Sequence, residues 1–199
     1  MMRLTVPKLI PFLVLLLSGS VAAHAQDKKD PLVKVRSEIF AKKWENAARE
    51  LAKVEKAGGC KVAICLATHA IISDGAGAGP EAVEYTRKAL AAGQDSGLNA
   101  QQYNDLGALL YRRAEGKREL LELAETTLRH ADSIYNGGAS NIRFNLAKVL
   151  QKLGRKDQAQ KIMKALEADG LLIDPSMAIL GDFQRPEPPI SRTVGNPAP

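Results

Sequence analysis

Apolar residues recur through the middle of the chain at the three- and four-residue steps of an amphipathic helix. The stretch 32–57 carries such a stripe. Its apolar positions are Val35, Ile39, Phe40, Ala47, Ala48, Leu51 and Val54. Asp30-Pro31 supplies a start signal and Gly58-Gly59 a stop signal. The pattern predicts one continuous helix over 32–57.

Six further helical segments are predicted between glycine-containing breaks. They cover 61–73, 80–92, 99–114, 117–135, 140–153 and 156–169. No segment alternates β-branched and polar residues with period two, so a sheet is not expected. The connections are short, which favours antiparallel packing of neighbouring helices. The predicted fold class is therefore all-α, with about seven helices.

A short signature repeats among these segments at intervals of forty residues. It consists of a leucine followed by a small residue, at Leu66-Ala67, Leu106-Gly107 and Leu146-Ala147. The segment after each one carries a small residue in turn, at Ala82, Ala124 and Ala159. Repetition of this kind is typical of an α-solenoid, in which stacked helix pairs bury one another's apolar faces.

The stretch 103–111 resembles the opening helix of a tetratricopeptide repeat (TPR), with Tyr103, Leu106-Gly107 and Tyr111 at the family's spacing. The next segment carries Ala124, Leu128 and Ala131, similar to the family's second helix. Small residues let two helices approach closely, and the bulky one fills the remaining gap. The resemblance covers about 60–173 and implies an α-solenoid of antiparallel pairs.

Residues 26–59 are interpreted as a linker and a capping helix, because a solenoid needs its exposed end covered. Trp44, Ala47, Ala48 and Leu51 also resemble an opening helix, which would shift the pairing of the segments. Both assignments stay open at this point.

The first 25 residues predict a secretory signal peptide. Arg3 and Lys8 precede a short apolar run, and Ala23-His24-Ala25 forms a small-x-small cleavage signal. The run is shorter than the roughly 20 apolar residues that span a bilayer. Cleavage after Ala25 is expected to give a soluble periplasmic or secreted bacterial protein, with no stable membrane insertion.

The carboxyl end, residues 174–199, has few helix formers and many prolines. Proline removes backbone donors and blocks helices, so a disordered proline-rich tail is predicted. Pro186-Glu187-Pro188-Pro189 offers the alternative of a polyproline ligand.

The net charge and its distribution along the chain argue against a nucleic-acid partner. The formal charge is +6, and removing residues 1–25 lowers it to +4. Basic residues alternate with acidic ones along the segments, as in Glu45, Arg49, Glu50 and Lys53, which is typical of a solvated helix face. A nucleic-acid partner would need a clustered basic surface, so none is expected.

Cys60 and Cys65 are candidates for a disulfide in an oxidising compartment. On one continuous helix their α-carbons would lie beyond about 7 Å, so a bridge requires Cys60 to precede the helix. A bridge and two unpaired thiols both remain open. Cys65 and His69 share a helical face, and with Cys60 they offer three ligands to zinc or copper. The set lacks a fourth ligand, so no metal and no cofactor is predicted.

No nucleophile motif, phosphate-binding loop or paired carboxylates stand out, so an enzyme is not predicted. The TPR resemblance instead implies a partner-binding groove on the opening helices. Its residues would be Asn104, Tyr111, Arg112, Asn141, Phe144, Lys148 and Lys152, together with Ala108 and Gln151. This polar, basic and aromatic set suits an extended acidic peptide or a chain terminus, although an ordinary solvated face is the alternative.

The sequence therefore favours a non-catalytic helical-repeat scaffold that binds another protein or a peptide outside the cytoplasm. One alternative is an exported metal- or thiol-dependent factor that uses Cys60, Cys65 and His69. The other is a structural subunit of an envelope complex whose tail docks into a larger assembly.

Overall fold

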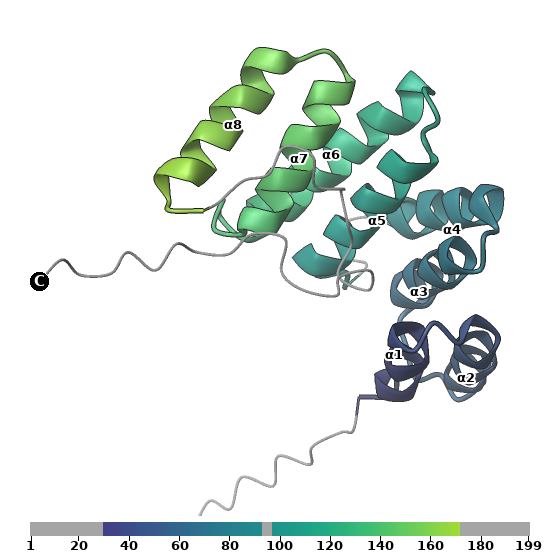
Figure 1. Cartoon of the computed structure of the whole chain (residues 1–199). Coiled ribbons are helices and arrows are strands. Elements are labelled where there is room, and N and C mark those ends of the chain that lie inside the picture. The colour runs from purple at the N-terminus through teal and green to yellow at the C-terminus, as the bar shows by residue number, and fades with distance from the viewer. Residues whose placement is uncertain (1–29, 93–96, 172–199) are drawn as a thin grey trace, which may run out of the picture.

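The computed structural model describes residues 30–92 and 97–171. The predicted signal peptide and the proline-rich tail lie outside these described residues. Within them the fold is all-α (Figure 1), with eight helices. These are α1 (Val33–Phe40), α2 (Trp44–Lys56), α3 (Val62–Gly75), α4 (Gly79–Ala91), α5 (Ala100–Arg113), α6 (Arg118–Ile134), α7 (Ser140–Lys152) and α8 (Lys156–Ala168).

The prediction of a single helix over 32–57 is wrong, because α1 ends at Phe40 and α2 begins at Trp44. Lys42 between them has a φ of 55°. Its backbone N–H donates to Ile39 O at 2.9 Å, and that of Lys43 donates to Glu38 O at 2.9 Å. These bonds form a Schellman motif, which ends a helix with one residue in the left-handed region. Glycine usually marks that position, and here a lysine occupies it, so no stop signal is visible in the sequence.

Lys42→Gly is expected to raise the free energy of unfolding by about 1 kcal/mol, because a left-handed residue with a β-carbon is strained. Ala41→Gly is the matched control, since Ala41 is its exposed neighbour with a φ of −75°. There glycine adds only chain entropy to the unfolded state and should destabilise. Urea denaturation of both variants measures the difference; equal effects of the two glycines would contradict the strain at Lys42.

Neighbouring helices pack in chain order across the molecule, from α1 and α2 at one end to α7 and α8 at the other (Figure 1). The most extensive contacts join α3 with α4, α5 with α6, and α7 with α8. These are the three pairs that the repeated signature predicts. Further contacts join α3 with α5 and α5 with α7, so the first helices of successive pairs also meet.

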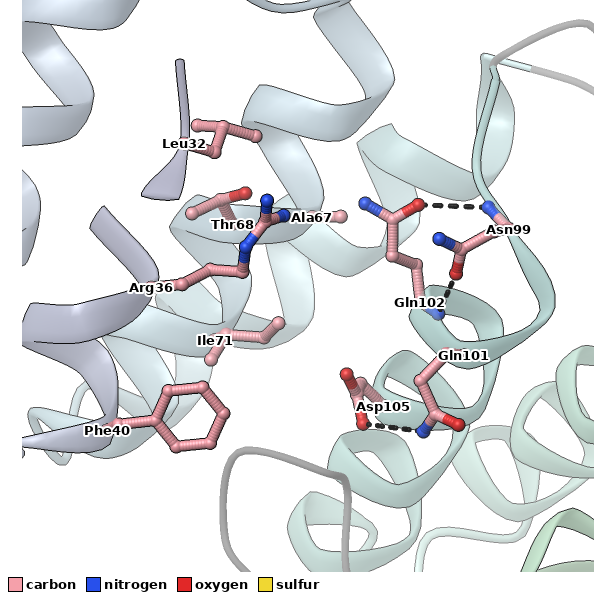
Figure 2. Close-up of a pocket in the computed structure, with 10 residues that line it drawn as sticks. All are labelled: Leu32, Arg36, Phe40, Ala67, Thr68, Ile71, Asn99, Gln101, Gln102 and Asp105. Carbon is pink, nitrogen blue, oxygen red and sulfur yellow. Dashed lines mark hydrogen bonds between the residues drawn. The ribbon is translucent and has the colours of Figure 1, made fainter. Parts of the chain in front are cut away.

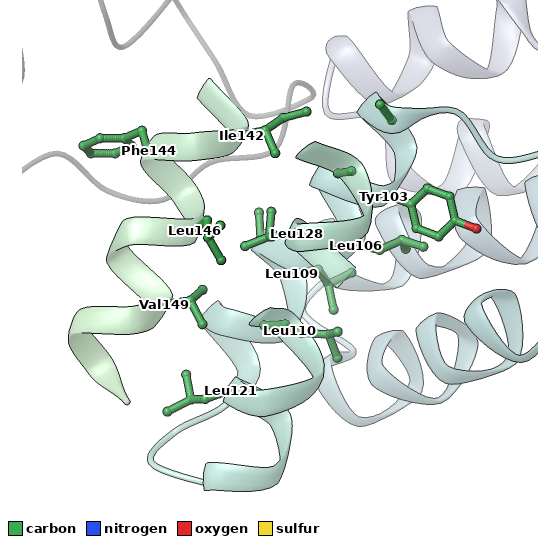
Figure 3. Close-up of a cluster of buried hydrophobic side chains, with 14 of the residues drawn as sticks. Tyr103, Leu106, Leu109, Leu110, Leu121, Leu128, Ile142, Phe144, Leu146 and Val149 are labelled. Atoms are coloured by element: carbon green, nitrogen blue, oxygen red, sulfur yellow. The ribbon is translucent and has the colours of Figure 1, made fainter. Parts of the chain in front are cut away.

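The α5–α6 contact has the close fit expected from Gly107. A β-carbon added at Gly107 would lie 2.6 Å from Leu128 Cγ, which is closer than real side chains approach one another. Leu128 is fully buried between Ala124 and Ala131, which are buried as well. Figure 3 shows Leu128 in the large cluster of buried side chains that runs through α3 to α8.

A second, smaller core joins α1 and α2 to α3. Val35, Ile39 and Leu51 are fully buried and pack with Ile72 of α3. A β-carbon at Gly75 would overlap the indole ring of Trp44. Trp44 of α2 therefore packs against the end of α3.

Candidate functional site

The first helices of the successive pairs border a pocket of about 220 Å³. Figure 2 shows its walls, which come from α1, α3 and the start of α5. Apolar side chains include Phe40 and Ile71, and polar ones include Thr68, Gln101 and Asp105. Phe40 is 58% exposed. The pocket thus combines an exposed apolar anchor with polar groups along one wall.

Hydrogen bonds hold the polar wall in place. Gln102 N–H donates to Asn99 Oδ1 at 2.9 Å, and Asn99 N–H donates to Gln102 Oε1 at 2.9 Å. This reciprocal capping box fixes the first turn of α5 at the pocket. Gln101 Nε2 approaches Asp105 Oδ1 at 3.5 Å (Figure 2). Contacts within α5 and its cap therefore hold this wall in place.

A buried pair of amides continues this face from α5 to α7. Asn145 Nδ2 donates to Asn104 Oδ1 at 2.8 Å, and both residues are buried. Asn104 Nδ2 is buried without an acceptor in the part of the chain that the structure describes. A buried donor left unsatisfied is costly, which makes it a candidate contact for a bound group.

The structure divides the predicted groove residues into three groups. Lys152 and Gln151 are exposed, and Tyr111, Asn141 and Lys148 are half-buried. Asn104, Ala108 and Phe144 are buried, with Phe144 only 1% exposed. Arg112 is half-buried in an ion pair. The three residues Asn141, Phe144 and Lys148 come together on one face of α7, since they are spaced by three and four positions.

The partner of Arg112 was missed by sequence reasoning. Asp74, at the end of α3, has a side chain only 3% exposed. It accepts from Arg112 Nη2 at 2.6 Å and from Arg113 Nε at 2.6 Å. Arg113 Nη2 also donates to the Asp74 carbonyl at 2.9 Å. Arg112 thus ties α5 to α3, and no local pattern marks an aspartate 38 positions away.

Two groups near this region have displaced pKa values. Burial raises the pKa of Tyr111. Burial also raises the pKa of Asp132, while the nearby charges of Arg143 and Arg129 act in the opposite direction. Burial is the largest cause in both cases, so these shifts follow from packing.

Cys60 and Cys65 form a disulfide with their α-carbons 6.1 Å apart. Cys60 precedes α3, which is the condition that the bridge requires. His69 lies beside Glu55, with Nε2 3.0 Å from Oε1, and stacks on the Tyr85 ring at a centroid distance of 4.9 Å. Bridged sulfurs are not the thiolates that ligate metals, so this geometry does not favour the metal-dependent alternative. No cluster of three metal-ligating side chains occurs among the described residues.

A scan against protein-family models finds no match to this chain, and a search of curated proteins finds no relative. The TPR resemblance therefore rests on the residue pattern alone. Over residues 30–92 and 97–171, none of the helices has the length and apolar character to cross a membrane.

Proposed function

We propose that the helices form a TPR-like α-solenoid that binds an extended segment of another protein, without catalytic turnover. The binding face is made by the first helices of the pairs, α1, α3, α5 and α7. The observation that carries the proposal is the pocket on this face with Phe40 exposed at its edge. Contacts of α3 with α5 and of α5 with α7 support one continuous face.

The chemistry of the face favours a partner segment with apolar and acidic residues. Phe40 and Ile71 offer apolar contact in the pocket. Lys148 and Lys152 add positive charge on α7. Helical grooves of this kind bind extended peptides through apolar anchors, and charges at the rim select among them.

We further propose export to the periplasm or outside the cell. The predicted signal peptide over residues 1–25 supports it. The Cys60–Cys65 disulfide agrees with it, because such bridges persist in oxidising compartments and are rare in the bacterial cytosol.

Affinity capture from the exported fraction of the host tests the binding role. The Lys148→Glu, Lys152→Glu double variant and Phe40→Asp are each expected to lower capture of the main partner by about tenfold, since each opposes the proposed contact. Lys164→Glu, at an exposed position on α8, is the control and should capture normally. Circular dichroism should give the same helical content for all. Capture that is unaffected in both groove variants would rule out this face.

A further inference from the structure

The Cys60–Cys65 disulfide lies where α1, α2 and α3 meet. A β-carbon added at Gly59, just before the bridge, would lie 3.0 Å from Val54 Cγ1 and 3.2 Å from Pro31 Cβ. The connection between α2 and α3 therefore passes close both to the end of α2 and to the turn before α1. Cys60 itself packs against the smaller core of these two helices. Its bond to Cys65 fixes that connection to α3.

The other contacts that hold α2 on α3 are limited. The contact of α2 with α3 is less extensive than that of α4 with α3, and α1 and α2 form one end of the molecule (Figure 1). Among the buried residues of the smaller core, α3 contributes Ile72. Glu55 of α2 pairs with His69 of α3 at 3.0 Å, but their side chains are 37% and 26% exposed, and pairs of this kind add little stability. Elements with few buried contacts open locally, so the covalent link matters most here.

The two sulfurs of the bridge differ in access. Cys60 is half-buried and precedes α3, whereas Cys65 is 7% exposed and lies in the first turn of that helix. Val62, within the loop that the bridge closes, is 73% exposed, so this loop lies at the surface. Thiol–disulfide exchange starts at the accessible sulfur and is favoured when the departing thiolate is stabilised. The first turn of a helix stabilises a negative charge, which suits Cys65 as the departing group.

We propose that this disulfide is a redox switch, which a dithiol reductant opens through Cys60 and which then loosens α1 and α2 from α3. A thiolate of the reductant attacks Cys60 Sγ, the bond between the two cysteine sulfurs breaks, and Cys65 leaves as a thiolate. The second thiol of the reductant attacks the reductant's own sulfur in the mixed disulfide and releases Cys60. Two electrons and two protons pass to the cysteines, and the reductant ends as a disulfide.

The switch acts on the proposed binding site through α1. Leu32 and Arg36 line the pocket together with Thr68 and Ile71 of α3 (Figure 2). When α1 loosens from α3, these two walls of the pocket separate. This consequence for the site rests on the binding role proposed above, whereas the switch itself does not.

Hydrogen exchange followed by mass spectrometry tests the switch on the full chain with its disulfide formed. After reduction with dithiothreitol, we expect the amides of residues 33–56 to exchange about tenfold faster, because α1 and α2 open locally. The amides of α5 to α8 should exchange at unchanged rates. The Cys60→Ser, Cys65→Ser variant is the matched control: it should exchange like the reduced protein, and dithiothreitol should have no effect on it.

A brief exposure to glutathione, with acid quenching and peptide mapping, locates the attacked sulfur, and we expect the mixed disulfide on Cys60. A mixed disulfide on Cys65 would overturn the proposal, as would a bridge that dithiothreitol cannot reduce in the native protein. Unchanged exchange of residues 33–56 after reduction, or equally faster exchange of all eight helices, would overturn it as well. None of these measurements involves a partner. The binding role fails separately, when the groove variants capture the partner as well as the wild-type protein does.

Discussion

Replacing Asp74 with alanine is expected to lower the free energy of unfolding by about 3 kcal/mol, within the range for breaking a buried ion pair. The Asp74 carboxylate is 3% exposed and accepts from Arg112 and Arg113 at 2.6 Å each. Without it, the two guanidinium groups lose the carboxylate on which they converge. The two arginine side chains are 25% and 29% exposed, so solvent screens part of the cost.

Urea denaturation of Asp74→Ala beside Glu84→Ala measures this effect. Glu84 pairs with Lys88 on the surface of α4, with side chains 64% and 55% exposed. Removing it should change stability by less than about 1 kcal/mol, as is usual for exposed pairs. Similar losses in the two variants would contradict the assignment of Asp74 as the residue that joins α3 to α5.

Introducing a leucine at Gly107 is expected to lower stability by about 3 kcal/mol or more, through overpacking of the α5–α6 contact. Even a β-carbon at this position would meet Leu128 Cγ at 2.6 Å. Leu128 is fully buried, so it cannot turn out toward solvent to make room. Thermal and urea unfolding of the variant measure the loss. Ala52→Leu, at an exposed position on α2, is the control and should have little effect.

A double-mutant cycle tests whether Leu128 is the cause. Leu128→Ala alone should cost about 2–5 kcal/mol, as buried leucine truncations do. With Leu128 shortened, Gly107→Ala should cost much less than in the wild-type background, because the two changes share one space. Additive effects would show that the crowding at Gly107 comes from elsewhere.

The predicted helices after residue 60 follow the structure closely, because their signals are local. Glycine breaks and apolar steps of three and four residues set where each segment starts and stops. These local signals did not predict the break between α1 and α2, because Lys42 adopts the left-handed backbone conformation in which glycine is usually found. The disulfide could not be decided either, because it depends on whether Cys60 falls before the first turn of α3.

The proposed binding face was only partly predictable. Spacing on α7 is local and predicts that Asn141, Phe144 and Lys148 share one face, but it does not reveal that Phe144 is only 1% exposed. The pocket beside Phe40 was not predicted, because three helices from distant parts of the sequence form its walls. Arg112 was assigned to the groove because nothing near it in sequence reveals Asp74 as its partner.

The sequence by itself determined the helical class, the limits of most helices and the close approach at Gly107, since each follows from periodicity and side-chain size along a short stretch. The tertiary structure alone decided which polar groups are paired. Asp74 meets Arg112 across 38 positions, and Asn145 meets Asn104 across 41. Such pairs depend on the packing of α3, α5 and α7 against one another, which brings distant residues within hydrogen-bonding distance. Within the described residues, the same packing leaves Asn104 Nδ2 without an acceptor.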